Sequence, residues 1–171
     1  PNTGKQYLKE VVGVANDLNK HIEWTTPSGF KVVHYYNKQQ KRRSKAALFN
    51  RKELIFYVKT NDVNSRESTQ AISPNFIHSI DAAHMFLTLD KISFYGIIDF
   101  SMIHDSYGCH ANFVDLMVNC LREEFVRIHS ENLLEEFKKE VENQLGVMLP
   151  DPPARGKLEL EKVLESDYFF A

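Results

Sequence analysis

The stretch YGIIDFSMIHDSYGCHA, Tyr95 to Ala111, decides the fold of the carboxyl-terminal half of this 171-residue chain. Its apolar, β-branched and aromatic residues predict a strand over residues 94–103 that ends in a turn at His104 and Asp105. A carboxylate at that point can be a turn acceptor, a salt-bridge partner or a ligand of Mg²⁺, which prefers oxygen donors. His104 can be a core residue or a donor to a phosphate. The stretch alone does not choose among these roles.

The segment SPNFIHSIDAAHMFLTLD, residues 73–90, predicts a helix directly before this strand. Ser73 is typical of an N-cap and Pro74 of a first helical residue. His78 and Asp81 are three positions apart and can face the same way, although Asp81 could equally be purely structural. The positions expected to pack inward are Phe76, Ile80, Ala83, His84, Met85 and Leu87.

The amino-terminal part predicts a helix over residues 3–20 and a turn at Pro27–Gly29 between two β-rich arms. A long hairpin is expected over residues 30–60, followed by a loop over 61–72. Seven Lys and Arg and no acidic residue occupy residues 37–52. Such a run can neutralise nucleic-acid phosphates, or it can be no more than a solvated loop.

Further along the chain, helical periodicity alternates with rigid loops. The predicted helices cover residues 111–129, 131–145 and 158–166, and the proline-rich segment LPDPPARG (149–156) predicts a loop. The expected fold class is α+β: mainly helical, with a long β-hairpin and a small antiparallel sheet. The chain is expected to form one structural unit with two parts, residues 1–72 and 73–171.

Composition excludes several classes of protein. The hydrophobic fraction of 43% supports a packed core, and no apolar run is long enough to predict a membrane span. Cys109 and Cys120 show neither a disulfide framework nor zinc-ligand spacing. Because the chain begins at Pro1 without a methionine, we expect a fragment of a larger protein.

Four collinear motifs resemble the single-subunit RNA polymerases of bacteriophages and mitochondria. They are PNFIHSIDAAHM (74–85), IHDSYG (103–108), WTTPSGF (24–30) and the ending PARGKLELEKVLESDYFFA (153–171). The resemblance implies a DNA-directed RNA polymerase, of which this chain is a carboxyl-terminal portion with palm and fingers parts. It also implies DNA template and promoter, RNA transcript, ribonucleoside triphosphates and the rest of the polymerase chain as partners.

The resemblance implies roles for four residues near the turn. Asp105 matches an aspartate that holds both Mg²⁺ ions of a two-metal nucleotidyl transfer, in which one ion activates the RNA 3′-hydroxyl and the other steadies pyrophosphate. His104 matches a histidine near the nucleotide phosphates. His78 matches a contact to the minor groove of the hybrid, and Asp81 is expected to orient these groups.

The resemblance also implies functional roles for the carboxyl-terminal tail and for the basic hairpin. Phe170 and Ala171 match a terminus that supports nucleotide binding. The hairpin matches a segment that reads promoter bases, with Arg42, Arg43 and Lys45 as candidates because Arg and Lys can pair with guanine. Some of these side chains are expected to contact only phosphate.

Two departures from the family pattern are important. The chain lacks the family's D-G aspartate and its R-x₃-K-x₃-Y-G helix, so the isolated 171 residues are predicted not to polymerise RNA. Gly108 favours a phage or prophage enzyme in the cytoplasm of a bacterial host, whereas LREEFVRIHS (121–130) favours the alternative, the mitochondrial matrix. The rival hypotheses are a palm-type DNA polymerase, in which Glu usually replaces Ser106, and a non-catalytic nucleic-acid-binding module.

Overall fold

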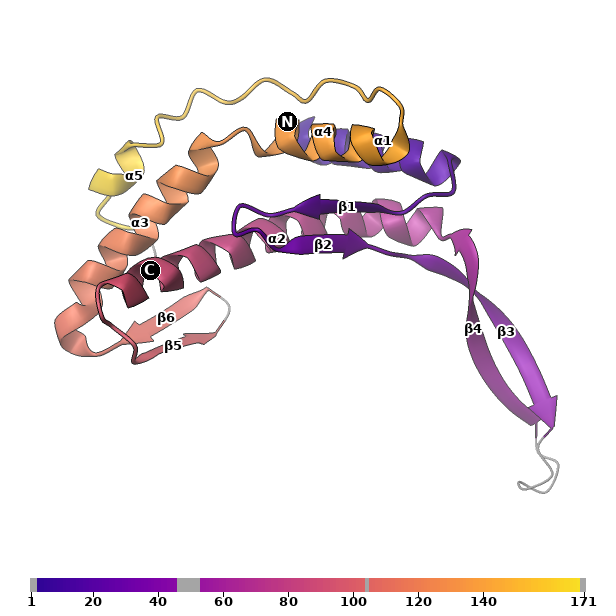
Figure 1. Ribbon diagram of the computed structural model, residues 1–171, viewed down its shortest axis with the longest axis horizontal. Coiled ribbons are helices and arrows are strands. Elements are labelled where there is room, and N and C mark those ends of the chain that lie inside the picture. The colour runs from indigo at the N-terminus through magenta and orange to yellow at the C-terminus, as the bar shows by residue number, and fades with distance from the viewer. Residues whose placement is uncertain (1–2, 46–52, 104, 170–171) are drawn as a thin grey trace.

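One 30-residue helix, α2 (Ser65–Phe94), runs through the molecule and carries the other elements on its flanks (Figure 1). At 1.5 Å per residue it is about 45 Å long. The computed structural model describes residues 3–45, 53–103 and 105–169. A hairpin projects from the body near one end of α2, and a second, shorter hairpin lies near the other end.

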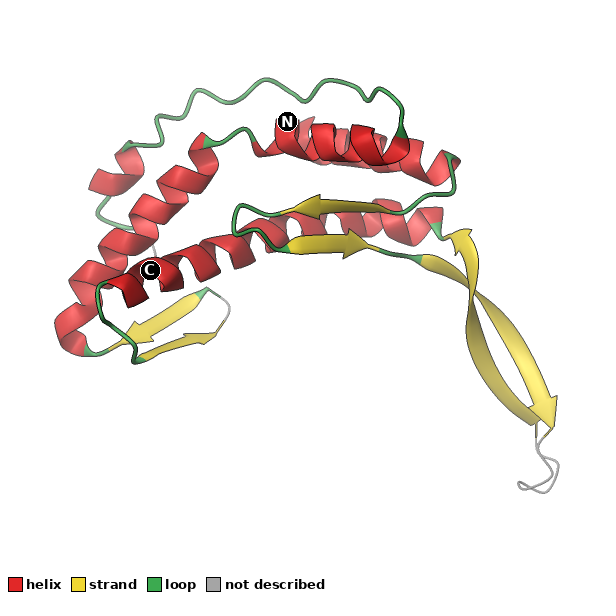
Figure 2. Cartoon of the chain, in the orientation of Figure 1, coloured by secondary structure: helices red, strands yellow, loops and turns green. Residues whose placement is uncertain are grey.

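The secondary structure is a mixture of helices and three separate two-stranded antiparallel sheets (Figure 2). The remaining helices are α1 (Thr3–Asp17), α3 (Val114–Ser130), α4 (Leu133–Leu145) and α5 (Lys162–Glu165), with a 3₁₀ turn η2 (Ala111–Phe113). The strands are β1 (Ile22–Thr25), β2 (Lys31–His34), β3 (Asn37–Lys45), β4 (Glu53–Val63), β5 (Phe100–Ile103) and β6 (Ser106–Cys109). The predicted α+β class is therefore confirmed.

The larger core packs α1, α4 and the β1–β2 hairpin against the first half of α2. Its centre is the buried Trp24, whose ring lies 5.9 Å from that of Phe76 and 5.7 Å from that of Phe137. The indole Nε1 donates to Ser79 Oγ at 3.0 Å, and Ser79 Oγ donates to the Phe76 carbonyl at 2.7 Å. This pairing satisfies the polar atoms that burial of the indole and hydroxyl removes from water.

A second, smaller core joins the other half of α2 to α3. We call it the second core; its buried members are Ile92, Ile97, Met117, Cys120 and Leu121. His84 closes its edge, because its Nε2 lies 2.8 Å from the Leu121 carbonyl. The prediction that His84 packs inward is confirmed.

The predicted start of the central helix is wrong. Helix α2 begins at Ser65, with Asn64 as its N-cap and the Asn64 side chain accepting from the backbone N–H of Glu67 at 3.3 Å. Pro74 therefore lies inside the helix, and residues 65–72, expected in a loop, are helical. Burial of Ile72 in the larger core supplies tertiary packing that outweighs the local cost of the proline.

Two strand predictions also need correction. The predicted strand over residues 94–103 is reduced to β5, because α2 continues to residue 94 and Gly96 turns the chain with φ +82°. The predicted hairpin over 30–60 is divided, since β2 pairs with β1, and β3 pairs with β4 up to Val63. Strand β5 is largely exposed, with Ile103 at 69%.

The carboxyl-terminal helices follow the predictions more closely. Helix α3 preceded by η2 covers the range predicted as 111–129, and α4 that predicted as 131–145. Helix α5 is shorter than the predicted 158–166. No helix in the described part of the chain combines the length and apolar character that crossing a bilayer requires.

Candidate metal and nucleic-acid site

The His-Asp hairpin, as we call strands β5 and β6 with their turn, places Asp105 at an exposed tip. Ile103 of β5 pairs with Ser106 of β6, and Asp105 lies in the turn directly before β6. Asp105 is exposed, as a ligand for an incoming ion must be. The predicted turn is confirmed at Asp105, whereas His104 lies outside the described residues.

Tyr107 links the tip of this hairpin to helix α2. Its side chain is partly buried against the second core. Burial raises the pKa of the Tyr107 hydroxyl, and the carboxylates of Asp81 and Asp105 raise it further. Both carboxylates therefore lie within electrostatic reach of one hydroxyl. Asp81 and Asp105, two of the residues that the sequence predicted for one site, thus both raise the pKa of the Tyr107 hydroxyl.

His78 and Asp81 are both exposed on α2, as their spacing predicted. His78 lines an apolar hollow of about 400 Å³ between α2 and the β1–β2 hairpin, where Phe30 and Phe86 also contribute. Asp81 acts on a different neighbour, His129 of α3. Burial lowers the pKa of His129, whereas the Asp81 carboxylate opposes that shift.

The carboxylates suit a magnesium ion only in part. Asp81 and Asp105 offer hard oxygen atoms, and Mg²⁺ is commonly held by one or two carboxylates together with water and substrate phosphates. Within residues 3–45, 53–103 and 105–169, no group of three or more His, Cys, Asp or Glu side chains is arranged to hold a metal ion. A magnesium ion at Asp105 would therefore need further ligands from outside these residues.

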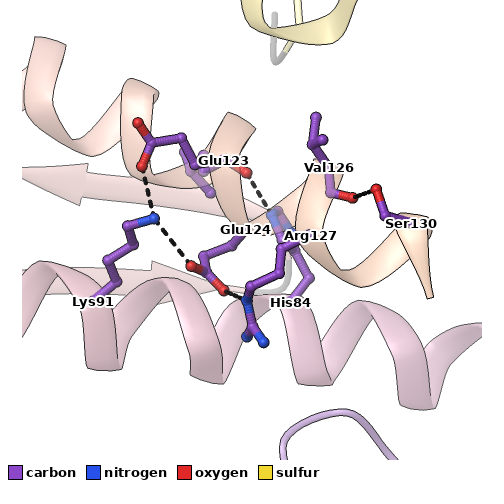
Figure 3. Close-up of polar contacts among 8 residues, drawn as sticks. His84, Lys91, Glu123, Glu124, Val126, Arg127 and Ser130 are labelled. Carbon is purple, nitrogen blue, oxygen red and sulfur yellow. Dashed lines mark hydrogen bonds and ion pairs between the residues drawn. The ribbon is translucent and has the colours of Figure 1, made fainter. Parts of the chain in front are cut away.

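An ion-pair cluster holds α2 and α3 together beside this site (Figure 3). Lys91 Nζ of α2 lies 2.6 Å from Glu123 Oε2 and 3.1 Å from Glu124 Oε1 of α3. Arg127 Nε donates to the other oxygen of Glu124 at 2.7 Å. Burial lowers the pKa of Lys91, but hydrogen bonds to the two glutamates outweigh it and raise that pKa overall. The nearly buried Glu124 thus has a cation on each carboxylate oxygen.

The long hairpin of β3 and β4, which we call the basic ribbon, has two different faces. Cross-strand partners share a face, and Lys41 pairs with Tyr57, whereas Arg42 pairs with Phe56. One face carries Gln39, Lys41, Arg43, Ile55, Tyr57 and Lys59, and the opposite face carries Gln40, Arg42, Ser44, Leu54, Phe56 and Val58. The first face is the more basic, and the second is apolar along β4.

Two features of the basic ribbon bear on the predicted base-reading residues. Arg43 Nη1 lies 3.7 Å from the Glu53 carboxylate, an exposed ion pair that contributes little stability. Arg42 lies on the face opposite Arg43, so the two cannot contact one groove edge in the same way. Lys45 is paired with Glu53 in the strand register. The predicted basic tip at residues 46–52 lies outside the described residues.

Lys59 is a basic residue of the ribbon that the sequence predictions omitted. Its Nζ lies 5.9 Å from the centroid of the Tyr35 ring, within cation–π range. The signal that could have found it is the alternation of β4, which puts Lys59 two positions from Tyr57 on the same face.

Phe170 and Ala171, predicted to support nucleotide binding, lie outside the described residues. The neighbouring Phe169 packs against the second core, with its ring 5.0 Å from that of Phe125. The described part of the tail therefore packs against the second core, as Tyr107 does.

Comparisons with known proteins agree with the motif resemblance. A family model described as DNA-dependent RNA polymerase matches residues 4–149. The mitochondrial DNA-directed RNA polymerase 1 of Arabidopsis thaliana is 37% identical over 170 residues, which cover 97% of this chain and 17% of that protein. The mitochondrial DNA-directed RNA polymerase of Schizosaccharomyces pombe is 35% identical, over 96% of this chain and 16% of that protein. DNA-directed RNA polymerase 1A of Nicotiana tabacum is 38% identical, over 89% of this chain and 96% of that sequence. The chain thus spans less than a fifth of the length of the first two relatives.

Proposed function

Because the chain belongs to the DNA-dependent RNA polymerase family, whose model covers residues 4–149, we propose that it acts as the carboxyl-terminal part of an enzyme that transcribes DNA. The observation that carries this proposal is the exposed Asp105 in the turn directly before β6, with its carboxylate and that of Asp81 both acting on the Tyr107 hydroxyl. We place these residues in the palm and fingers region of the complete polymerase and keep the division into residues 1–72 and 73–171 as part of the proposal.

In this proposal Asp105 holds Mg²⁺ at the exposed tip of the His-Asp hairpin. The ion, when bound, supplies stabilisation of charge that develops on the reacting phosphate. Asp81 and Tyr107 set the position and electrostatic environment of the Asp105 carboxylate. His78, exposed one turn before Asp81, contacts the nucleic acid. His104, Phe170 and Ala171 keep the nucleotide-binding roles that the resemblance implies.

The basic ribbon contacts promoter DNA through the face of Lys41, Arg43 and Lys59. A duplex binds a row of cations through its phosphates, and Arg or Lys side chains can reach base edges in the major groove. Arg43 and Lys45 are assigned to base reading. Arg42, on the face with Leu54, Phe56 and Val58, is assigned a smaller part in DNA binding.

The isolated chain does not polymerise RNA in this proposal, because its sequence lacks the family's D-G aspartate and its R-x₃-K-x₃-Y-G helix. The organellar relatives support an organelle, mitochondrion or chloroplast, as the site of action rather than a bacterial host.

The family match is to RNA polymerases, which disfavours the DNA polymerase hypothesis. A non-catalytic binding module is the hypothesis that the following experiment distinguishes.

The test is Asp105→Asn in the complete polymerase, assayed for elongation of a primed RNA–DNA hybrid and for promoter binding. Asparagine preserves the size of the side chain and removes its charge. Elongation should fall by about 10²–10³-fold or more, as when a group that stabilises transition-state charge is removed, whereas promoter binding should be unchanged. Asp99→Asn, an exposed aspartate just before β5, is the matched control. Elongation at the wild-type rate in Asp105→Asn would refute the metal role.

A further inference from the structure

Arg122 of α3 holds the carboxyl-terminal segment against the body of the molecule. Its Nη1 donates to the carbonyls of Val163 at 3.3 Å and Leu164 at 3.1 Å, both in α5. A helix of four residues leaves its carbonyls without partners of its own, so a fixed cationic donor satisfies groups that would otherwise need water. Figure 1 shows α5 lying along α3, after a loop that returns over the molecule from α4.

Beyond α5, the tail is held by aromatic contacts around the same arginine. The Arg122 guanidinium carbon lies 6.0 Å from the centroid of the Phe169 ring, and Phe125 meets that ring edge-on. Arg122 therefore contacts the segment at two points, its helix and its last described residue. The contacts of Arg122 with α5 and with Phe169 together hold residues 163–169 more firmly than either contact would alone.

Phe169 and the His-Asp hairpin pack against the same small cluster. The second core is flanked by Tyr107 and Cys109 of β6 and by Phe169 of the tail. A two-stranded hairpin has little stability of its own, and most of β5 is exposed, with Ile103 at 69%. The position of the hairpin therefore depends on the few β6 side chains that pack inward. Loss of Phe169 would uncover part of the second core, the cluster against which those β6 side chains pack.

We propose that Arg122 is a positioning residue, which anchors the carboxyl-terminal segment on the second core and thereby fixes the His-Asp hairpin that presents Asp105. The anchoring follows from contacts within this chain. Its consequence for catalysis rests on the proposed function of Asp105. Arg122 itself does not touch the reacting groups in this proposal.

The first test measures amide hydrogen exchange in the complete polymerase carrying Arg122→Ala. Exchange should become roughly tenfold faster or more in residues 163–169, the factor expected from loss of hydrogen bonds to a charged donor. It should also become faster in residues 106–109. Arg122→Lys, which retains the charge and one donor group, should restore part of the protection. Phe169→Leu keeps the hydrogen bonds of Arg122 but weakens the packing of the tail against the second core. It should therefore also make amide exchange faster in residues 106–109.

Arg155→Ala is the matched control. Arg155 also donates to two backbone carbonyls of α3, those of His129 and Ser130, but it does not touch Phe169 in the described structure. It should leave the exchange of residues 106–109 unchanged. Faster exchange of 163–169 in Arg122→Ala with unchanged exchange of 106–109 would overturn the coupling, and unchanged exchange of both would overturn the anchor.

The second test measures the Mg²⁺ concentration that gives half-maximal elongation. If Arg122 positions Asp105, Arg122→Ala should raise that concentration several-fold, and Arg155→Ala should not. A lower maximal rate with an unchanged Mg²⁺ requirement would overturn the positioning role, because it means only that fewer molecules are folded. If the wild-type polymerase does not elongate RNA at all, the proposed function fails, and the exchange experiment still decides the anchor.

Discussion

The basic ribbon and the His-Asp hairpin share one topology, two antiparallel strands, and differ in what holds them. The basic ribbon stands away from the body, and the apolar β4 residues Leu54 to Val58 are all exposed. The His-Asp hairpin is short, but Tyr107 and Cys109 pack on the second core. A metal ligand needs a fixed position, whereas a DNA-reading segment can be ordered by the DNA. The difference matches the two proposed roles.

The roots of the two hairpins differ as well. The basic ribbon is attached through polar contacts: Asn75 Nδ2 donates to the Tyr36 hydroxyl at 2.9 Å, and the backbone N–H of Val63 donates to Asn19 Oδ1 at 2.8 Å. His34 Nε2 lies 3.0 Å from the Ser68 carbonyl beneath them. The His-Asp hairpin is attached through apolar side chains and stands beside the ion-pair cluster of Figure 3. Changes in each root should therefore affect only one hairpin.

The largest effect on stability is expected at the ion-pair cluster. Glu124→Gln removes the nearly buried carboxylate between Lys91 and Arg127 and leaves both cations without that partner. The free energy of unfolding should fall by about 3 kcal/mol, the lower end of the range for a broken buried pair because both cations reach solvent. Urea denaturation measures the loss, and hydrogen exchange should show it in β6 before β3.

Glu123→Gln provides the control for that prediction. Glu123 is half exposed and also contacts Lys91, so its loss should cost less than about 1 kcal/mol. Equal losses in the two variants would mean that burial of Glu124 does not set the strength of the cluster.

An intermediate effect is expected on the more basic face of the ribbon. Lys41→Ala combined with Lys59→Ala should lower promoter affinity and reduce the slope of log affinity against log salt by about one for each phosphate that is no longer neutralised. Arg42→Ala, on the opposite face, should change that slope less. Binding measured over a series of salt concentrations checks this, and an equal change from Arg42→Ala would show that both faces meet DNA.

The smallest effect is expected at the root of the basic ribbon as the pH falls. Burial lowers the pKa of His34, and the nearby His21 lowers it further, whereas the Ser68 carbonyl opposes the shift. The unfolded ring binds a proton near pH 6.5, about its ordinary pKa. Below that pH the unfolded state holds more protons than the folded state, so the free energy of unfolding should fall until the folded pKa is passed.

Denaturation with urea above about pH 7 and below about pH 6 measures this dependence. His34→Gln, which can still donate to the Ser68 carbonyl, should show a weaker dependence on pH. If both proteins lose stability equally, other groups cause the change.

The sequence predicted the elements whose signals are local. The turn at Asp105, the turn around Ser28 and the inward-facing His84 were predicted from their own neighbours. The start of α2 was missed although a local signal exists, since Asn64 followed by Glu67 is typical of a helix N-terminus. Pro74 gave a competing signal. The prediction of a bacterial host from Gly108 is not supported, because the relatives are organellar. The structure itself does not require glycine at this position, since an added Cβ would lie 3.7 Å from the Ser101 carbonyl oxygen, an ordinary contact distance.

The sequence by itself determined the family and the α+β class, because motif spacing and local propensity are written along the chain, and it supplied the site residues that the proposed function uses. Only the tertiary structure decided which of these residues meet. It packed Tyr107 of the His-Asp hairpin against the second core, separated Arg42 from Arg43 on the ribbon, and joined Arg122 to the tail. These arrangements depend on strand register and on packing between segments far apart in sequence. Neither strand register nor packing between distant segments leaves a local pattern in the sequence.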